Sequence, residues 1–327
     1  MLGQRVKRPG ADLAGEVEAV GRNVTRFKPG DAVFGASGGG GFAEYACPPE
    51  SRLAKMPANV DFETAACVNV AGRTALQGLR DIANVQAGQK VLINGASGGI
   101  GTFAVQIAKW LGADVTGVCS TQNVDLVRRL GADHVIDYTR EDFTRGDERY
   151  DVIYDLVGDK PLLALRSVLK PKGIYVGAGV LGKEASMIRM LAGMFNAALL
   201  SLFTKQKFIS FMTKSNTDDL PVLAGIMETG KVKPVIDRTF SLNDVAEAVH
   251  YVDAKHARGK VVISVGGPLS LHVEAENELS QLWITNARGP AIDRRYRLSE
   301  VAEAIAYLKK RHARGKVIIA MEDNNEI

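Results

Sequence analysis

The residues from Ile93 to Gly101 could hold a phosphorylated cofactor. They read Ile-Asn-Gly-Ala-Ser-Gly-Gly-Ile-Gly, follow an apolar run at 90–94, and precede a segment with apolar residues at helical spacing. A glycine-rich loop between a strand and a helix lets the backbone approach a pyrophosphate, and the N–H groups and dipole of the helix then face it. A tight turn alone is the simpler interpretation, but the order of the elements favours a dinucleotide site.

The residues after the next strand indicate which dinucleotide is bound. An NAD site usually carries Asp or Glu about 20 residues further on, where the acid binds the ribose 2′-hydroxyl. Here the chain reads Ser120, Thr121, Gln122 and Asn123, and the first acid is Asp125, inside the expected next helix. A 2′-phosphate is then not repelled, and three of these side chains can donate hydrogen bonds to it. We therefore expect NADPH rather than NADH. The alternative is that these residues only cap the helix.

Repeated strand-helix units must position this loop. Apolar runs that alternate with helical patterns lie at 90–94, 114–119, 134–138, 150–157 and 173–178. The helical patterns end at Gly112 and Gly131. Such alternation predicts an α/β fold with a Rossmann doubly wound parallel sheet and helices on both faces. Before Gly72, Gly and Pro separate short alternating runs, which predicts antiparallel β-structure with tight turns.

Length and composition exclude several classes of protein. The 327 residues suffice for two domains, and 46% hydrophobic with 24% charged residues is typical of a globular chain. A net charge of +4 gives no reason to expect a nucleic-acid partner. Three separated cysteines predict neither a disulfide framework nor a four-cysteine metal site, and favour a reducing cytoplasm. No signal peptide is expected, and the apolar stretch from Met187 to Phe203 is interrupted by polar residues, so we expect no membrane span.

The tail contains an internal repeat. Residues 235–265 align without gaps on residues 291–321, with 16 of 31 positions identical. Each copy predicts a strand, an amphipathic helix, an Arg-Gly-Lys turn and a closing strand. Two copies are too few for a solenoid, so we interpret them as a duplicated terminal unit.

These residues resemble the medium-chain dehydrogenase/reductases, within them the zinc-free quinone oxidoreductase and enoyl reductase-like branch. The match is carried by GADLAGEVEAVGRNVTRFKPGDAVFG at 10–35, GQKVLINGASGGIGTFAVQIAKWLGADVTGVCST at 88–121 and HARGKVVI at 256–263, among other motifs. The resemblance implies a partial GroES-like catalytic domain at 1–73, a Rossmann NAD(P)-binding domain at 74–215, a return to the catalytic domain at 216–265, and an extension at 266–327 that holds the second repeat copy.

The resemblance also implies which residues contact the cofactor, while catalytic residues stay unassigned. The expected cofactor residues are Thr74 near the nicotinamide, Ser97, Gly98, Gly99, Ile100 and Gly101 at the pyrophosphate, Ser120, Thr121, Asn123 and Tyr138 near the 2′-phosphate, Val157 near the adenosine, and Ala178 and Gly179 on the nicotinamide side. Many relatives have Lys or Arg where this chain has Gln122, and the missing cation weakens the case for a 2′-phosphate.

The same resemblance implies chemistry without zinc. In zinc alcohol dehydrogenases the counterpart of Gly10-Ala11-Asp12 carries a His ligand where this chain has Ala11, which cannot bind a metal. We therefore expect an NADPH-dependent reductase acting on a small quinone, enone or similar carbonyl compound. A homodimer through the edges of the Rossmann sheet is an expectation of the same kind.

The family normally begins well upstream of the GADLAG motif, so the opening barrel strands and the usual substrate-orienting residues are expected to be missing. Unpaired strand edges favour association unless something covers them. One hypothesis is that the copy at 291–321 covers part of that surface.

Two alternatives stay open at this point. The loop from Gly95 to Gly101 fits the G-x-x-x-G-x-G of short-chain dehydrogenases, and Tyr251 with Lys255 fits their Tyr-x-x-x-Lys. Against this, a β-rich segment precedes the loop, and the second repeat copy has Arg311 in place of the lysine. The other alternative is a cofactor-binding remnant that acts as a sensor or partner protein, because function depends on the site and not on the fold.

Overall fold

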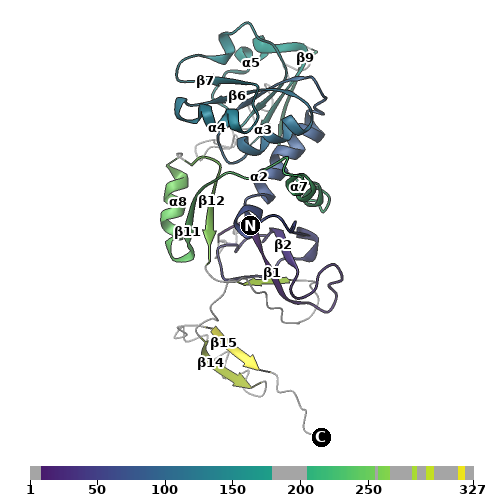
Figure 1. The fold of residues 1–327 in the computed structure, drawn as a ribbon, viewed down its shortest axis with the longest axis vertical. Coiled ribbons are helices and arrows are strands. Elements are labelled where there is room, and N and C mark those ends of the chain that lie inside the picture. Colours follow the sequence, from purple (N-terminus) through teal and green to yellow (C-terminus); the bar gives the residue numbers. More distant parts are fainter. Residues whose placement is uncertain are drawn as a thin grey trace, which may run out of the picture. The chain divides into compact units, whose positions relative to one another are not determined.

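The computed structural model describes residues 9–178, 205–254, 257–265, 282–285, 292–297 and 316–320, the last three as backbone only. The chain divides into two compact units (Figure 1). The first contains Met1–Val265 and Leu269–Asn286, and the second contains Gly266–Pro268 and Ala287–Ile327.

A parallel sheet of six strands carries the glycine-rich loop. Its strands are β5 (Lys90–Asn94), β6 (Asp114–Cys119), β7 (His134–Asp137), β8 (Tyr150–Asp155), β9 (Leu169–Ala178) and β10 (Lys207–Phe211). They lie in the order β10-β9-β8-β5-β6-β7, and every neighbouring pair is parallel. This confirms the predicted Rossmann sheet. The chain runs outward from β5 to β7 and then returns to β8, so the topological switch point lies beside β5, where open α/β sheets bind ligands.

Helices precede, separate and follow these strands along the chain (Figure 1). They are α1 (Phe62–Ala66), α2 (Asn69–Leu76), which continues as a π-helical stretch (Gln77–Ile82), α3 (Gly101–Trp110), α4 (Val124–Arg129), α5 (Leu162–Val168) and α7 (Asp219–Glu228). Gly112 and Gly131, shortly after α3 and α4, have φ of +85° and +101°. Glycine adopts this left-handed backbone without strain, which is why both helices stop where the sequence predicts.

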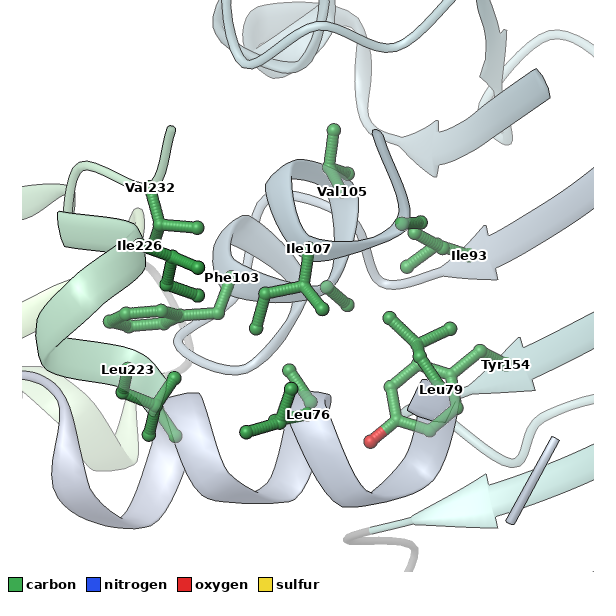
Figure 2. Packing of buried hydrophobic residues seen from close by; sticks show 14 of the residues in the cluster. Leu76, Leu79, Ile93, Phe103, Val105, Ile107, Tyr154, Leu223, Ile226 and Val232 are labelled. Atoms are coloured by element: carbon green, nitrogen blue, oxygen red, sulfur yellow. The ribbon is translucent and has the colours of Figure 1, made fainter. Parts of the chain in front are cut away.

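The main core joins α2, α3 and α7 to the parallel sheet (Figure 2). Leu76 of α2, Phe103 of α3 and Leu223 of α7 are each fully buried in it. Burying one such side chain contributes about 1.5 to 3 kcal/mol to stability. The α2 region and the helix after the glycine-rich loop therefore rest on one shared core.

A second, antiparallel sheet forms in the N-terminal region, as its alternating pattern predicts. Its strands are β1 (Asp12–Val20), β2 (Ala32–Ala36), β3 (Tyr45–Ala46), β4 (Leu53–Lys55) and β13 (Leu282–Thr285), in the order β3-β13-β1-β2-β4. Leu13 and Val17 on one face of β1 pack with Val33 and Leu53 in a separate small core.

Strand β13 comes from the far end of the chain and lies between β1 and β3. Ile284 is opposite Val17 on one side and Ala46 on the other. The sequence hypothesis assigned such covering to the copy at 291–321, but the strand that pairs with β1 precedes that copy.

The two repeat copies form matching pairs of parallel strands. In the first unit, β11 (Ile236–Ser241) pairs with β12 (Lys260–Ser264), and α8 (Val245–Asp253) lies between them in sequence. In the second unit, β14 (Ile292–Arg297) pairs with β15 (Lys316–Ala320). Ile236 faces Lys260 in one pair and Ile292 faces Lys316 in the other, and both pairs have the same irregularity after that point. The repeat in sequence is thus a repeat in strand register.

Within the described ranges, no helix is both long and apolar enough to cross a membrane. The stretch from Met187 to Phe203 lies outside the described residues.

Candidate cofactor site

The glycine-rich loop is a tight connection between β5 and α3. Gly95 has φ of +86°, and the N–H groups of Gly95 and Ala96 donate to the carbonyl oxygen of Val118 at the end of β6. A side chain on Gly101 would collide with the carbonyl oxygen of Gly95. Glycine at these two positions therefore permits the turn and the close start of α3, which brings the first turn of the helix to the switch point.

The amide of Asn123 links this loop to the end of β6. Its Nδ2 donates to Oγ of Ser97 at 3.2 Å and to Oγ of Ser120 at 3.1 Å. Asn123 is 9% exposed, and its buried Oδ1 has no hydrogen-bond partner among the described residues. Because both serine oxygens accept from Asn123, their protons are directed elsewhere. Both hydroxyls, at the positions predicted for the pyrophosphate and the 2′-phosphate, thus keep their protons for another acceptor.

Thr121, the third predicted donor, is bonded to a carboxylate. Its hydroxyl donates to Oδ2 of Asp137 at 2.6 Å, and Thr139 donates to the other oxygen of Asp137 through its hydroxyl at 2.7 Å and its backbone N–H at 3.0 Å. The bonds from Thr121 and Thr139 hold the pKa of Asp137 below its usual range, so the carboxylate is ionised. Tyr138, the next residue, is 60% exposed, and its N–H donates to the carbonyl of Cys119.

A turn from the first repeat copy docks on the glycine-rich loop. The N–H of Gly259 donates to the carbonyl of Ser97 at 2.9 Å. A Cβ on Gly99 would lie 3.5 Å from Cδ of Lys260, so the lysine stem runs beside the loop. Arg258, the first residue of this Arg-Gly-Lys turn, donates from Nη2 to Oε1 of Gln122 at 3.4 Å.

Sequence reasoning did not single out Arg258 or Lys260 as site residues. The signal available was that the Arg-Gly-Lys turn occurs in both repeat copies. A turn more than 130 residues from its partner loop has no local pattern that reveals the contact.

Of the remaining predicted residues, Val157 lies beside the glycine-rich loop, whereas Thr74 and Ala178 have other neighbours. Thr74 is buried in α2 and its hydroxyl contacts the Val70 carbonyl at 2.6 Å and the Thr213 hydroxyl at 2.7 Å. Val157 is 51% exposed, and a Cβ on Gly95 would lie 3.0 Å from it. Ala178 is buried at the end of β9, and Gly179 lies outside the described residues.

A cavity of about 290 Å³ opens beside the turn and α2. The residues that bear on its chemistry are Ala11, Asp12, Phe42, Cys67, Val70 and Lys260. Oδ1 of Asp12 accepts from Nδ2 of Asn69 at 2.9 Å and from the N–H of Val70 at 3.0 Å, while its Oδ2 lies 3.4 Å from Nζ of Lys260. Burial raises the pKa of the Cys67 thiol to about 12, so the thiol is neutral and not a nucleophile.

In the part of the chain that the structure describes, no three or more His, Cys, Asp or Glu side chains lie close enough together to hold a metal ion. Ala11, at the position of the zinc ligand in zinc alcohol dehydrogenases, lines the cavity.

The short-chain dehydrogenase interpretation conflicts with the surroundings of Tyr251. Its hydroxyl donates to Oδ2 of Asp237 at 2.6 Å, and this bond raises the pKa of Tyr251. A catalytic tyrosine of that kind needs a lowered pKa. Lys255, its expected partner, lies outside the described residues.

Two family models match the chain. "Alcohol dehydrogenase GroES-like domain" matches residues 4–58, and "Zinc-binding dehydrogenase" matches residues 130–263 and 269–319. The second stretch of the latter contains most of the second repeat copy.

Characterised proteins and solved structures are similar over most of the chain. The quinone-oxidoreductase QR1 of Triphysaria versicolor is 34% identical over 271 residues, which cover 78% of this chain and 79% of that protein. The NADPH-dependent alkenal/one oxidoreductase of Arabidopsis thaliana is 36% identical over 78% of this chain and 63% of its own length. The structure of the quinone oxidoreductase from Coxiella burnetii is 28% identical, with a TM-score of 0.69 over 79% of each chain.

Proposed function

The chain belongs to the medium-chain dehydrogenase/reductase superfamily, and from that membership we propose that it is an NADPH-dependent, zinc-free oxidoreductase acting on a small quinone, enone or related carbonyl compound. Its relatives are oxidoreductases, and their names include a quinone oxidoreductase and an NADPH-dependent alkenal/one oxidoreductase. The resemblance seen in the sequence, including the GroES-like and Rossmann parts, is confirmed by these matches.

The observation that carries the cofactor proposal is the chemistry at the end of β6. No carboxylate stands at Ser120, Thr121 or Gln122, where an NAD site has an acid that binds the ribose 2′-hydroxyl. Asn123 instead fixes the hydroxyls of Ser97 and Ser120 so that each can donate outward. Two directed donors beside a glycine-rich turn fit a cofactor with phosphates at both places.

The chain's own residues then have separate tasks. Ser97 and the first turn of α3 hold the pyrophosphate, and the α2 surface near Val70 and Thr74 borders the nicotinamide side. Lys260 places a positive charge between the loop and the cavity, where it stabilises negative charge on a phosphate or on a carbonyl oxygen. When bound, NADPH supplies the hydride.

The cavity beside Asp12 is the proposed substrate space. Its walls are mostly alanine, valine and isoleucine with Phe42, and its volume of about 290 Å³ suits a small uncharged carbonyl compound. Ala11 at the zinc-ligand position leaves polarisation of the carbonyl to protein groups. A cytoplasmic location and a homodimer stay predictions.

Two measurements test this function. We expect the purified protein to change the fluorescence of NADPH at lower concentrations than that of NADH, and to oxidise NADPH in the presence of a small quinone or an α,β-unsaturated ketone. Treatment with a strong zinc chelator is expected to leave the rate unchanged. Equal affinity for both cofactors would contradict the NADPH assignment, and binding without turnover of either acceptor class would contradict the reductase.

A further inference from the structure

We propose that Arg258 supplies the positive charge that recognises the adenosine 2′-phosphate of NADPH. This inference rests on the proposed function, since it concerns the same cofactor site. The cation comes from the repeat-copy turn, whereas Gln122, in the loop after β6, is neutral.

The first support is the position of the guanidinium. Gln122 lies in the short 3-10 turn Thr121–Asn123, directly after β6 and Ser120. Nη2 of Arg258 lies 3.4 Å from Oε1 of Gln122. Two cavities of about 330 and 480 Å³ share Gln122, Asp237 and Arg258 in their linings, so the guanidinium borders open space beside the predicted 2′-phosphate position.

The second support is the way in which the backbone of this turn is fixed. Gly259 donates to Ser97 of the glycine-rich loop at 2.9 Å, and Lys260 donates to the carbonyl of Val235 at 2.8 Å. The N–H of Arg258 donates to Oδ2 of Asp237 at 3.1 Å. The base of the Arg258 side chain is therefore held against the predicted pyrophosphate loop, while its exposed head makes one long bond, to Gln122, that a phosphate would replace.

The third support is the balance of charge. Asp137 is ionised and lies one hydrogen bond from Thr121, and the charge of Arg140 also lowers the pKa of Asp137. A second anion at this edge of the sheet therefore needs a further cation. In the part of the chain that the structure describes, Arg258 pairs with no carboxylate, and Asp237 is bonded to Tyr251 and to the Arg258 backbone. A guanidinium in this state can form two parallel bonds to a phosphate, which a lysine cannot.

The test measures dissociation constants of the full-length protein for NADPH and NADH. Arg258→Ala is expected to raise the dissociation constant for NADPH about tenfold and to change the dissociation constant for NADH by no more than about twofold. The reason is that the lost bond is made to the 2′-phosphate, which only NADPH carries. The matched control is Arg129→Ala, which removes another arginine that lines one of the two cavities from α4. It is expected to leave both constants unchanged.

A rescue variant separates a charge contact from a structural role. Adding Gln122→Arg to Arg258→Ala restores a cation beside Ser120, and we expect it to recover most of the preference for NADPH. If Arg258→Ala weakens both cofactors equally, or leaves the preference intact, the assignment of Arg258 is wrong while the proposed function stands. If the unmodified protein binds NADPH and NADH equally well, the proposed NADPH dependence is wrong, and so is the assignment of Arg258.

Discussion

At the scale of single residues, Asn123 shows how one amide can organise two binding groups. Asn123 orients the hydroxyls of Ser97 and Ser120, two predicted cofactor residues, by donating to both. Its position is buried, so water cannot easily replace it in this role. We propose that Asn123, which the sequence predicts as a cofactor contact, also positions Ser97 and Ser120.

Replacing Asn123 tests this role. Asn123→Ala is expected to weaken NADH binding about fivefold, because Ser97, which we propose faces the pyrophosphate that both cofactors share, loses its orienting bond. NADPH binding should weaken further, because Ser120, which we propose faces the 2′-phosphate, loses its orienting bond as well. Asn123→Asp accepts rather than donates and adds a negative charge, so we expect it to weaken NADPH more than NADH. Fluorescence titration with each cofactor gives the constants. A variant Asn123→Ala with unaltered affinities would show that the two serines need no orientation.

The site was predictable where its chemistry is local. The glycine spacing between Gly95 and Gly101 and the missing acid after β6 are short-range patterns, and both point to the loop that we propose binds the cofactor. The approach of Arg258 and Lys260 to this loop was not predictable, because it depends on how a distant turn docks on Ser97 and Gly99. Hydrophobic periodicity says which face of a segment is buried but not which loop it meets.

At the scale of elements, a buried carboxylate joins α7 to the end of α2. Asp219, the first residue of α7, is fully buried and accepts from Nε2 of Gln77 at 2.6 Å, Nη2 of Arg80 at 2.6 Å and Nδ2 of Asn216 at 2.8 Å. Burial alone raises the pKa of Asp219, but the bonds from these three side chains outweigh it and hold that pKa below its usual range. The carboxyl group of Asp219 is therefore ionised in the folded protein.

This contact predicts how stability depends on pH. A folded-state pKa below the unfolded value gives stability that is present above the unfolded pKa of about 3.9 and is lost as the pH falls toward the folded pKa. Asp219→Asn is expected to lower the free energy of unfolding at pH 7 by about 3 kcal/mol, since it leaves Arg80 without its buried partner. The loss between pH 5 and 3 should then be shallower than in the unmodified protein.

Urea unfolding at pH 7 and pH 4 measures both effects. The exposed neighbour Asp218, replaced by Asn, is the matched control and should change little. Parallel pH profiles for Asp219→Asn and the unmodified protein would contradict this assignment.

Element prediction succeeded for the parallel sheet and failed for β13. The apolar runs that form β5, β6 and β8 are bounded by glycine or by helical patterns. The neighbouring residues are therefore enough to predict that each run is a strand and where it ends. The run Leu282–Thr285 is only four residues long, and its sequence does not indicate that it pairs with β1 and β3. Two strands from distant parts of a chain pair where the sheet has an unpaired strand edge, and which edge is unpaired depends on the whole sheet.

At the scale of the whole molecule, β13 and the second repeat copy can be separated by truncation. A chain that ends at Val265 loses both, whereas a chain that ends at Asn286 keeps β13 and loses the second repeat copy. We expect the first to melt about 5 °C lower and to associate, because the edges of β1 and β3 lose their shared strand. The second should melt close to the full chain.

Melting curves and light scattering compare the three proteins. Affinity for NADPH is expected to be the same in all of them, because the glycine-rich loop, Ser120 and Arg258 all precede residue 266. Identical melting temperatures would show that β13 does not stabilise the antiparallel sheet. A low melting temperature in both truncated chains would assign the stabilisation to residues beyond 286 instead.

The position of β13 late in the chain also means that β1 is synthesised well before its pairing strand. A ribosome adds the residues between Val20 and Thr285 in roughly 15 to 50 s at about 5 to 20 residues per second. Throughout that interval β1 is already made, but the strand that pairs with its outer edge does not yet exist. On a polysome, neighbouring nascent chains carry the same open edge and can pair with one another. Yield of the native protein should therefore depend on translation speed and on chaperones that shield this edge until Leu282–Thr285 emerges.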